Sequence, residues 1–193
     1  RNMVTKHVKK GWRFVVVVGG GGTARQYQEA ARKAGKLTRD DLDWLGIHAT
    51  RLNAHLLRTI FRERAEPEII TNPTVRLFSQ KKILVASGWK PGWSTDYVAV
   101  ILAREYGAKT ILNLSNIDYV YDKDPKKHQD AGIKLKISWP EFRKLVGNIW
   151  SPALNTPFDP MAAKKAQALK LEVIIMNGRK MANLANYLAD KKF

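Results

Sequence analysis

Short apolar runs alternate along the chain with amphipathic stretches in which apolar residues recur every three to four positions. The runs cover 14–18, 83–86, 110–114 and 171–176, and the amphipathic stretches cover 4–10, 24–34, 38–60, 96–106, 139–146, 160–169 and 181–189. The first pattern predicts buried strands and the second predicts helices. Strands that alternate with helices favour a parallel sheet covered on both faces. We therefore predict an α/β fold, a three-layer α-β-α sandwich with a mainly parallel sheet, as a single domain over 1–193.

Several helix ends carry their own signals. Thr38 is placed to cap the long helix that follows it, and Ser138 with Glu141 forms a capping box. Asp159 gives a similar start signal for the helix over 160–169. We expect Pro67 to end the segment after the long helix, because proline interrupts regular hydrogen bonding.

Composition and charge narrow the class of protein. The formal net charge is +17 and the chain contains no cysteine, which excludes a disulfide framework and a thiolate zinc site. The positive charge is spread over both halves, without zinc-finger spacing or an RNA-binding aromatic signature, so we do not expect a nucleic-acid partner. Since no apolar run approaches the length of a membrane span and no signal-peptide pattern is present, we predict a soluble, cytoplasmic protein.

The stretch VVVVGGGGT, residues 15–23, places bare backbone at the end of a predicted strand. Glycines leave no side chain between the backbone and a ligand, which suits a phosphate. The pattern G-x-G-x-x-A at Gly19, Gly21 and Ala24 admits a dinucleotide fold, but that fold requires an acidic residue after the next strand. Walker A spacing is absent. A tight turn without a ligand remains an alternative.

A second glycine loop, GWKPGWSTD over 88–96, also joins a predicted strand to a predicted helix. In open parallel sheets, ligands collect at the carboxyl ends of the strands, where both loops fall. Two such loops indicate two phosphate-bearing ligands. Simple helix capping by Ser94, Thr95 and Asp96 is the alternative.

Polar and aromatic residues follow the strand over 110–114. Asp118, Asp122 and Asp124 alternate with Tyr119 and Tyr121, but the glycine and the late glutamate of a calcium-binding EF-hand are absent. We favour a contact with a base and a ribose. The two histidines of the long helix, His48 and His55, lack a third metal ligand and are expected to be packing residues.

Five motifs in this order carry a resemblance: GGGGTARQYQ, DDLDWLGIHATRLNA, GWKPGWSTDYVAV, NLSNIDYVYDKDP and FDPMAAKKAQ. Together they resemble the amino-acid kinase superfamily and, within it, the UMP kinases of the bacterial and archaeal type. The resemblance implies transfer of the ATP γ-phosphoryl group to UMP, with Mg²⁺ accompanying ATP. It also implies a homo-oligomer, a hexamer built from dimers or a dimer.

The resemblance implies roles for particular residues. Three parts of the chain would bind UMP: one residue of the first glycine loop, an acidic residue that lies one turn into the long helix and faces that loop, and the second glycine loop. These residues are Gly20, Asp43, Gly88, Trp89, Lys90, Pro91, Gly92, Trp93, Ser94 and Thr95. ATP would be bound by Gly21, Arg25, Ser115, Tyr121 and Asp124. Asp96 and Arg25 would serve the transfer step, and no protein metal site is implied.

The chain also departs from the family pattern. Family members begin with a strand and a glycine loop that binds the ATP phosphates, so we expect that element upstream of Arg1 and a further strand after Phe193. Gly22 stands where relatives often carry a bulkier residue. Two alternatives follow: another small phosphoryl acceptor on the same fold, or a nucleotide-binding protein without activity.

Overall fold

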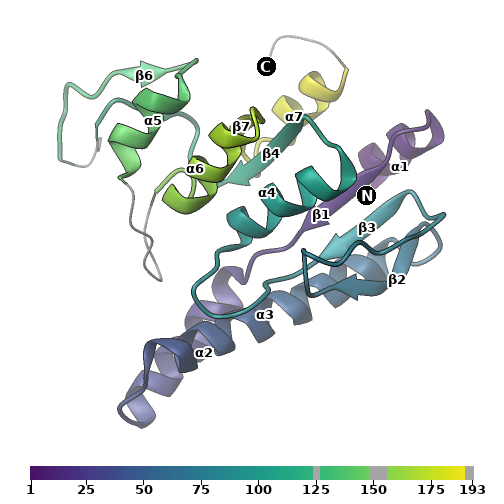
Figure 1. Ribbon diagram of the computed structural model, residues 1–193, viewed down its shortest axis with the longest axis horizontal. Helices are drawn as coiled ribbons and strands as arrows, with labels where there is room; N and C mark the ends of the chain where they lie inside the picture. Colours follow the sequence, from purple (N-terminus) through teal and green to yellow (C-terminus); the bar gives the residue numbers. More distant parts are fainter. Residues whose placement is uncertain (124–126, 148–155, 190–193) are drawn as a thin grey trace. The chain divides into compact units, whose positions relative to one another are not determined.

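The computed structural model describes residues 1–123, 127–147 and 156–189. The chain divides into two compact units, Arg1–Tyr106 and Gly107–Phe193, whose helices and strands are labelled in Figure 1.

The first unit is built around a parallel sheet. Its elements are, in order, α1 (Asn2–Lys9), β1 (Phe14–Val17), α2 (Gly21–Ala34), α3 (Arg39–Ile60), β2 (Ala65–Ile70), β3 (Ile83–Ala86) and α4 (Thr95–Tyr106). The strands pair in parallel in the order β1-β3-β2, with Val16 opposite Val85 and Ile70 opposite Ala86. β3 is thus central, and all its residues are buried.

Helices cover both faces of this sheet. Ile83 and Val85 of β3 pack with Ala54 of α3, whereas Leu84 packs with Val98 of α4 on the other face. Successive side chains of a strand point to opposite faces, so the short apolar run of β3 supplies both halves of the core. The predicted order of helix, sheet and helix layers is confirmed within this unit.

Helices α3 and α2 begin in different ways, since a side chain caps α3 but not α2. Thr38 and Asp41 form a capping box at the start of α3, as Thr38 predicted. α2 begins at Gly21, three residues before the predicted start at Ala24. The amide of Ala24 donates to the carbonyl of Gly20 at 3.1 Å, so the residues between them close the first helical turn despite their lack of apolar side chains.

The prediction that Pro67 ends the segment after α3 is wrong. Pro67 lies inside β2, a strand that the sequence analysis missed. β2 is the outer strand in the order β1-β3-β2, and its register against β3 shifts between Ala65 and Ile69. Proline is tolerated at such positions because an edge strand or a bulge needs no N–H group there.

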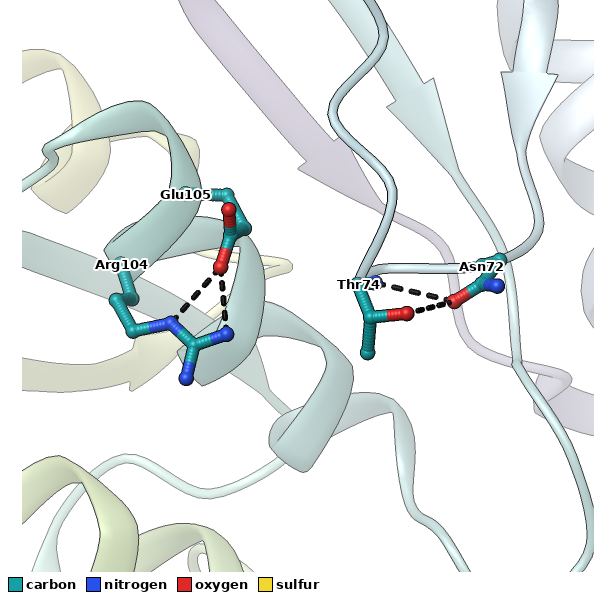
Figure 2. Close-up of polar contacts among 4 residues, drawn as sticks. All are labelled: Asn72, Thr74, Arg104 and Glu105. Atoms are coloured by element: carbon teal, nitrogen blue, oxygen red, sulfur yellow. Dashed lines mark hydrogen bonds and ion pairs between the residues drawn. The ribbon is translucent and has the colours of Figure 1, made fainter.

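The chain leaves β2 through a short turn that Asn72 holds. Its side-chain Oδ1 accepts hydrogen bonds from the amide of Thr74 at 3.1 Å and from the Thr74 hydroxyl at 2.7 Å (Figure 2). This is a turn in which a side chain replaces a backbone acceptor. The same figure shows the exposed ion pair of Arg104 and Glu105 near the end of α4, which contributes little to stability.

The second unit holds a parallel pair of strands and a small antiparallel pair. Its elements are β4 (Thr110–Ser115), β5 (Val120–Tyr121), β6 (Ile133–Lys134), α5 (Trp139–Val146), α6 (Pro160–Ala168), β7 (Glu172–Asn177) and α7 (Met181–Leu188). β4 pairs with β7 in parallel, and β5 pairs with β6 antiparallel. The predicted caps Ser138 and Asp159 accept from the amides of Glu141 and Ala162, which confirms both helix starts.

Candidate functional site

The first glycine loop forms a concave run of backbone at the start of α2. Gly20 is in the right-handed region, with φ −74° and ψ −25°, and Gly21 follows with φ +57°. Successive right- and left-handed residues turn their N–H groups toward one point, an arrangement that binds anions. Among the described residues, no acceptor takes the N–H groups of Gly20, Gly21 or Gly22. The loop therefore presents donors suited to a phosphate.

Two of the four glycines are required by the fold itself. A Cβ on Gly20 would lie 2.5 Å from the Cβ of Ala24, and the φ of Gly21 is one that other residues rarely adopt. A Cβ on Gly19 or Gly22 would meet nothing within 4 Å in the described residues. Packing among the described residues therefore does not require glycine at those two positions.

Helix α3 holds this loop through Asn53. The side-chain Nδ2 of Asn53 donates to the carbonyl oxygens of Gly19 at 2.9 Å and Gly20 at 3.1 Å. The sequence analysis did not single out Asn53.

The second glycine loop, 88–94, is held by the same helix. The buried amide of Gly88 donates to Oγ1 of Thr50 at 2.7 Å, and the amide of Gly92 donates to Oδ2 of Asp43 at 2.9 Å. A Cβ on Gly88 would lie 3.0 Å from the Thr50 oxygen and 3.4 Å from Ile47, so a larger residue here would require these neighbours to shift by a few tenths of an ångström. Thr50 was also missed.

Asp43 contacts the second glycine loop. It was expected to face the first glycine loop, and its carboxylate accepts from the amide of Gly92 in the second. The carbonyl oxygen of Gly46, one helical turn after Asp43, lies 3.4 Å from the Cβ position of Gly20 in the first loop. The same face of α3 therefore borders both loops.

Residues 94–96 join the second loop to α4. Oγ of Ser94 accepts from the amide of Tyr97 at 3.1 Å, so the capping alternative is confirmed for Ser94. Thr95 and Asp96 form the first turn of α4 and are half-buried. An acid in the first turn is also favourable to the helix dipole, so a structural role for Asp96 accompanies any chemical one.

Aromatic rings line the second loop. The Trp93 ring lies 4.2 Å from that of Tyr97 and 5.8 Å from that of Trp89, and the Lys90 ammonium lies 4.3 Å from the Trp89 centroid. Trp89 also packs on the buried cluster of Leu84 and Val98, which fixes this end of the loop. The loop thus offers aromatic faces and one cation beside its backbone donors.

Arg25 is the cation nearest in sequence to the first loop. It lies one turn into α2, is exposed and makes no hydrogen bond or ion pair with any described residue. A positive charge near a helix N-terminus opposes the helix dipole, so its place there is favourable only with an anion nearby.

In the second unit, polar residues gather at the carboxyl ends of β4 and β7. The amide of Gly178 donates to the carbonyl of Ser115 at 2.8 Å, and Asp118 accepts from Asn177 at 3.0 Å and pairs with Lys180 at 2.9 Å. Hydrogen bonds from Lys180 and from Asn177 lower the pKa of the Asp118 carboxyl. The contact with Asp118 raises the pKa of Lys180, so this pair stays ionised at neutral pH.

The predicted ATP residues of this unit have different environments. Ser115 ends β4 beside Gly178, and half-buried Tyr121 pairs with Ile133 in the β5–β6 ladder. Asp124 lies outside the described residues. No signal in the sequence connected Asn177 and Lys180 to the carboxyl end of β4, because they follow Ser115 by 62 and 65 positions. The parallel pairing of β4 with β7 brings them there.

Other chemistries find little support. No group of three or more His, Cys, Asp or Glu side chains suited to a metal ion occurs within 1–123, 127–147 and 156–189. His48 and His55 are both exposed, and the His48 ring lies 6.0 Å from that of Trp44, so His48 packs at the surface rather than in the core. A dinucleotide fold fails because β2, the strand after the first loop, is followed by Thr71 and Asn72 rather than an acid.

Two hollows lie away from the glycine loops. One, of about 250 Å³, lies between α5 and α6 beside Arg143 and Gln167, and the other, of about 230 Å³, lies beyond β2 beside Asn72 and Arg76. Neither hollow is lined by a residue of the two loops. In the part of the chain that the structure describes, no helix has the length and apolarity needed to cross a membrane.

The two loops on α3 form the candidate site of the first unit. They offer outward backbone donors, Arg25, a carboxylate at Asp43 and aromatic faces, which together suit a phosphorylated ligand with hydroxyls and a ring. Such a site can bind and orient a nucleotide. Direct transfer of a phosphoryl group depends on positioning and charge, which backbone donors and a cation can supply.

Comparison with known proteins agrees with this chemistry. The model of the amino acid kinase family matches residues 1–177. A uridylate kinase of Sulfurisphaera tokodaii is 32% identical over 99% of this chain and 86% of its own length. One from Hyperthermus butylicus is 38% identical over 90% of this chain and 77% of its own.

Solved structures share the fold. The uridylate kinase of Archaeoglobus fulgidus superposes with a TM-score of 0.81 at 29% identity, over 98% of this chain and 86% of that one. An aspartate kinase from Synechocystis superposes with a TM-score of 0.72 at 17% identity, over 93% of this chain and 34% of that one, and supports the fold alone. The chain belongs to the amino acid kinase family, and its relatives in sequence and in fold include uridylate kinases.

Proposed function

We propose that this protein transfers the γ-phosphoryl group of ATP to UMP, producing ADP and UDP for pyrimidine nucleotide synthesis. The observation that carries the proposal is the pair of glycine loops mounted on one helix, with free amides in the first and Asp43 beside the second. The names of the relatives, uridylate kinases, support the same acceptor.

Phosphoryl transfer between two nucleotides depends on position and charge rather than on a covalent intermediate. The amides of Gly20 and Gly21 bind phosphate oxygens of UMP and ATP, and Arg25 adds a positive charge where the transferring group is most negative. The free oxygen of Asp43 accepts from the ribose hydroxyls of UMP, while residues 88–95 surround its base and phosphate. Asp96 orients the groups around the transferring phosphoryl.

Magnesium enters as part of the ATP complex. Mg²⁺ usually keeps several waters and binds substrate phosphates with one or two carboxylates, so it needs no protein cage. Asp96, in the first turn of α4, would be the carboxylate that approaches such an ion. ATP itself would contact Ser115, Tyr121 and Asp124 through its adenine and ribose.

Other acceptors on this fold are the second candidate. A carboxylate or carbamate acceptor would have no use for the aromatic faces of Trp89 and Trp93 or for a carboxylate at Asp43. An assay of ADP release with ATP and Mg²⁺ separates these candidates. We expect UMP to stimulate release at least tenfold over CMP, aspartate and carbamate, the discrimination that one site-specific hydrogen bond provides. Equal stimulation by a non-nucleotide acceptor would contradict the proposal.

We also propose a homo-oligomer that contacts itself through α3. Trp44, His48, Leu52, Leu56 and Ile60 form an exposed ridge at four-residue spacing, and none carries a formal charge although the chain has a net charge of +17. Ridges of this spacing pack against each other in helix pairs, and a two-fold contact uses the same patch twice. A cytoplasmic location remains a prediction.

A further inference from the structure

Thr50 occupies an unusual place between the two glycine loops. It is 5% exposed, and its hydroxyl donates to the carbonyl of Ile47 at 2.6 Å while it accepts from the amide of Gly88 at 2.7 Å. Because the hydroxyl hydrogen is committed to Ile47, a lone pair of the oxygen stays directed at Gly88. The start of the second loop is thereby fixed to α3.

The methyl group of Thr50 faces the other loop. Its Cγ2 lies 3.7 Å from the point that a Cβ on Gly20 would occupy, at van der Waals distance from that space. The Thr50 side chain therefore contacts the second loop through Oγ1 and lies against the first loop through Cγ2. The separation of the two loops depends on the size and polarity of this residue.

Asn53 controls the direction of the donors in the first loop. A trans peptide places its C=O and N–H on opposite sides. The carbonyl oxygens of Gly19 and Gly20 are held by Asn53, so the N–H groups of Gly20 and Gly21 point away from α3. Without this anchor both peptides could rotate and lose the common direction that an anion requires.

We propose that Thr50 and Asn53 are positioning residues for the transfer step. They do not contact a substrate; they set the spacing of the two loops and the direction of the Gly20 and Gly21 amides. The expected effect of these residues on the transfer rate rests on the proposed function. Their expected effect on the spacing of the loops and the direction of the amides does not. Both residues lie on one face of α3, three positions apart, so a single helix aligns the two loops.

Three variants and one matched control test the proposal. Thr50→Val keeps the shape and methyl contact but leaves the buried Gly88 amide without an acceptor, whereas Thr50→Ser keeps the hydroxyl. Asn53→Leu keeps the shape and removes both hydrogen bonds. The control is Thr59→Val on the same helix, where the exposed hydroxyl donates only to His55 among described residues.

Amide hydrogen exchange gives the structural result without any turnover. In Thr50→Val, exchange at Gly88 should accelerate at least about tenfold, the effect of losing one net hydrogen bond, with the native rate retained in Thr50→Ser and Thr59→Val. In Asn53→Leu, the amide resonances of Gly20 and Gly21 should shift while that of Gly88 stays. Unchanged exchange at Gly88 in Thr50→Val would overturn the role of Thr50, whatever the acceptor.

Kinetics with UMP and ATP give the second result. Misplacement of a group by about 1 Å can cost a hundredfold in rate, so kcat of Thr50→Val should fall about a hundredfold while KM for UMP changes less than about fivefold. Thr50→Ser should recover most of the loss. If the wild type fails to phosphorylate UMP, the proposed function fails and the exchange result still decides the structural role. If the wild type is active and Thr50→Val keeps its kcat, or Thr59→Val loses as much, the positioning role is wrong.

Discussion

The glycines of the first loop are not equivalent. Gly20 and Gly21 are demanded by a close contact and by a left-handed φ, whereas Gly22 is a helical position with open space around its Cβ site. Gly22→Ala should therefore raise the free energy of unfolding by about 0.4 to 1 kcal/mol, through the entropy of the unfolded chain. Gly20→Ala should lower it by about 1 to 3 kcal/mol, because the new methyl would overlap Ala24.

Urea unfolding followed by circular dichroism measures both effects. Gly22→Ala also tests the proposed contact between the loop amides and a nucleotide. A methyl group near the free amides should weaken UMP or ATP binding although it stabilises the fold. A stable Gly20→Ala variant would show that the first loop can move away from Ala24, contrary to its tight position here.

Asp43 combines a structural hydrogen bond with the proposed contact to ribose. Asp43→Asn retains an oxygen for the Gly92 amide and removes the charge, whereas Asp43→Ala removes both. We expect Asp43→Ala to raise the KM for UMP by roughly one to two orders of magnitude, as for loss of a charged hydrogen bond of about 1.5 to 3 kcal/mol. Asp43→Asn should show most of this increase if the ribose contact dominates.

Steady-state kinetics at saturating ATP provides the measurement, and Asp40→Ala in the same helical turn is the control. A KM for UMP that stays at the wild-type value in Asp43→Ala removes this residue from the site. A large increase in the KM for UMP in Asp43→Ala, with no increase in Asp43→Asn, would show that Asp43 only accepts the hydrogen bond from Gly92.

At the scale of elements, the stabilisation that the capping box gives to the start of α3 depends on pH. The Thr38 hydroxyl and amide donate to Oδ2 of Asp41, and these hydrogen bonds lower the pKa of the Asp41 carboxyl. A lowered pKa means that the stabilisation is complete above the ordinary Asp value of about 3.9 and is lost as pH falls through the folded value. The difference in unfolding free energy between wild type and Asp41→Asn should therefore be present at neutral pH and shrink in acid.

Urea titrations at pH 7 and near pH 3 test this difference, with Asp40→Asn as the control in the same turn. A difference that stays constant over this range would contradict the assignment of the capping box to the charged form of Asp41.

Elements with end signals were the most predictable. Thr38, Ser138 and Asp159 each cap the helix they were expected to cap, because a capping hydrogen bond is local in sequence. β2 was not predicted, since its proline contradicts the pattern of a strand and only the irregular register at the sheet edge accommodates it. β5 and β6, at two residues each, are too short to show any periodicity.

The candidate site was predictable in part for the same reason. Both glycine loops were visible because each is continuous in sequence. Thr50 and Asn53 were not visible as site residues, since their partners lie more than 30 positions away. The available signal was the spacing of Asp43, Gly46, Thr50 and Asn53, which places polar or small residues on one face of the helix.

At the scale of the whole molecule, the exposed ridge of α3 makes a prediction about assembly. Leu52 is 61% exposed at the middle of the ridge, and Leu52→Lys would place two like charges together across a two-fold contact. We expect this variant to become monomeric by light scattering, with the wild type forming at least a dimer. Phe78→Lys is the control, because Phe78 is 83% exposed but lies outside α3, and its substitution should leave the assembly unchanged. A monomeric wild type, or dissociation in both variants, would contradict a contact through this ridge.

The central claim is that the protein transfers the γ-phosphoryl group of ATP to UMP. ATP labelled at the γ-phosphate, incubated with the protein, Mg²⁺ and saturating UMP, distinguishes transfer from hydrolysis and from binding alone. We predict that label appears in UDP in equal amount to the ADP formed, and that omission of UMP abolishes both. Label that appears only in inorganic phosphate, or that never leaves ATP when UMP is saturating, would contradict the assignment of this protein as a kinase that acts on UMP.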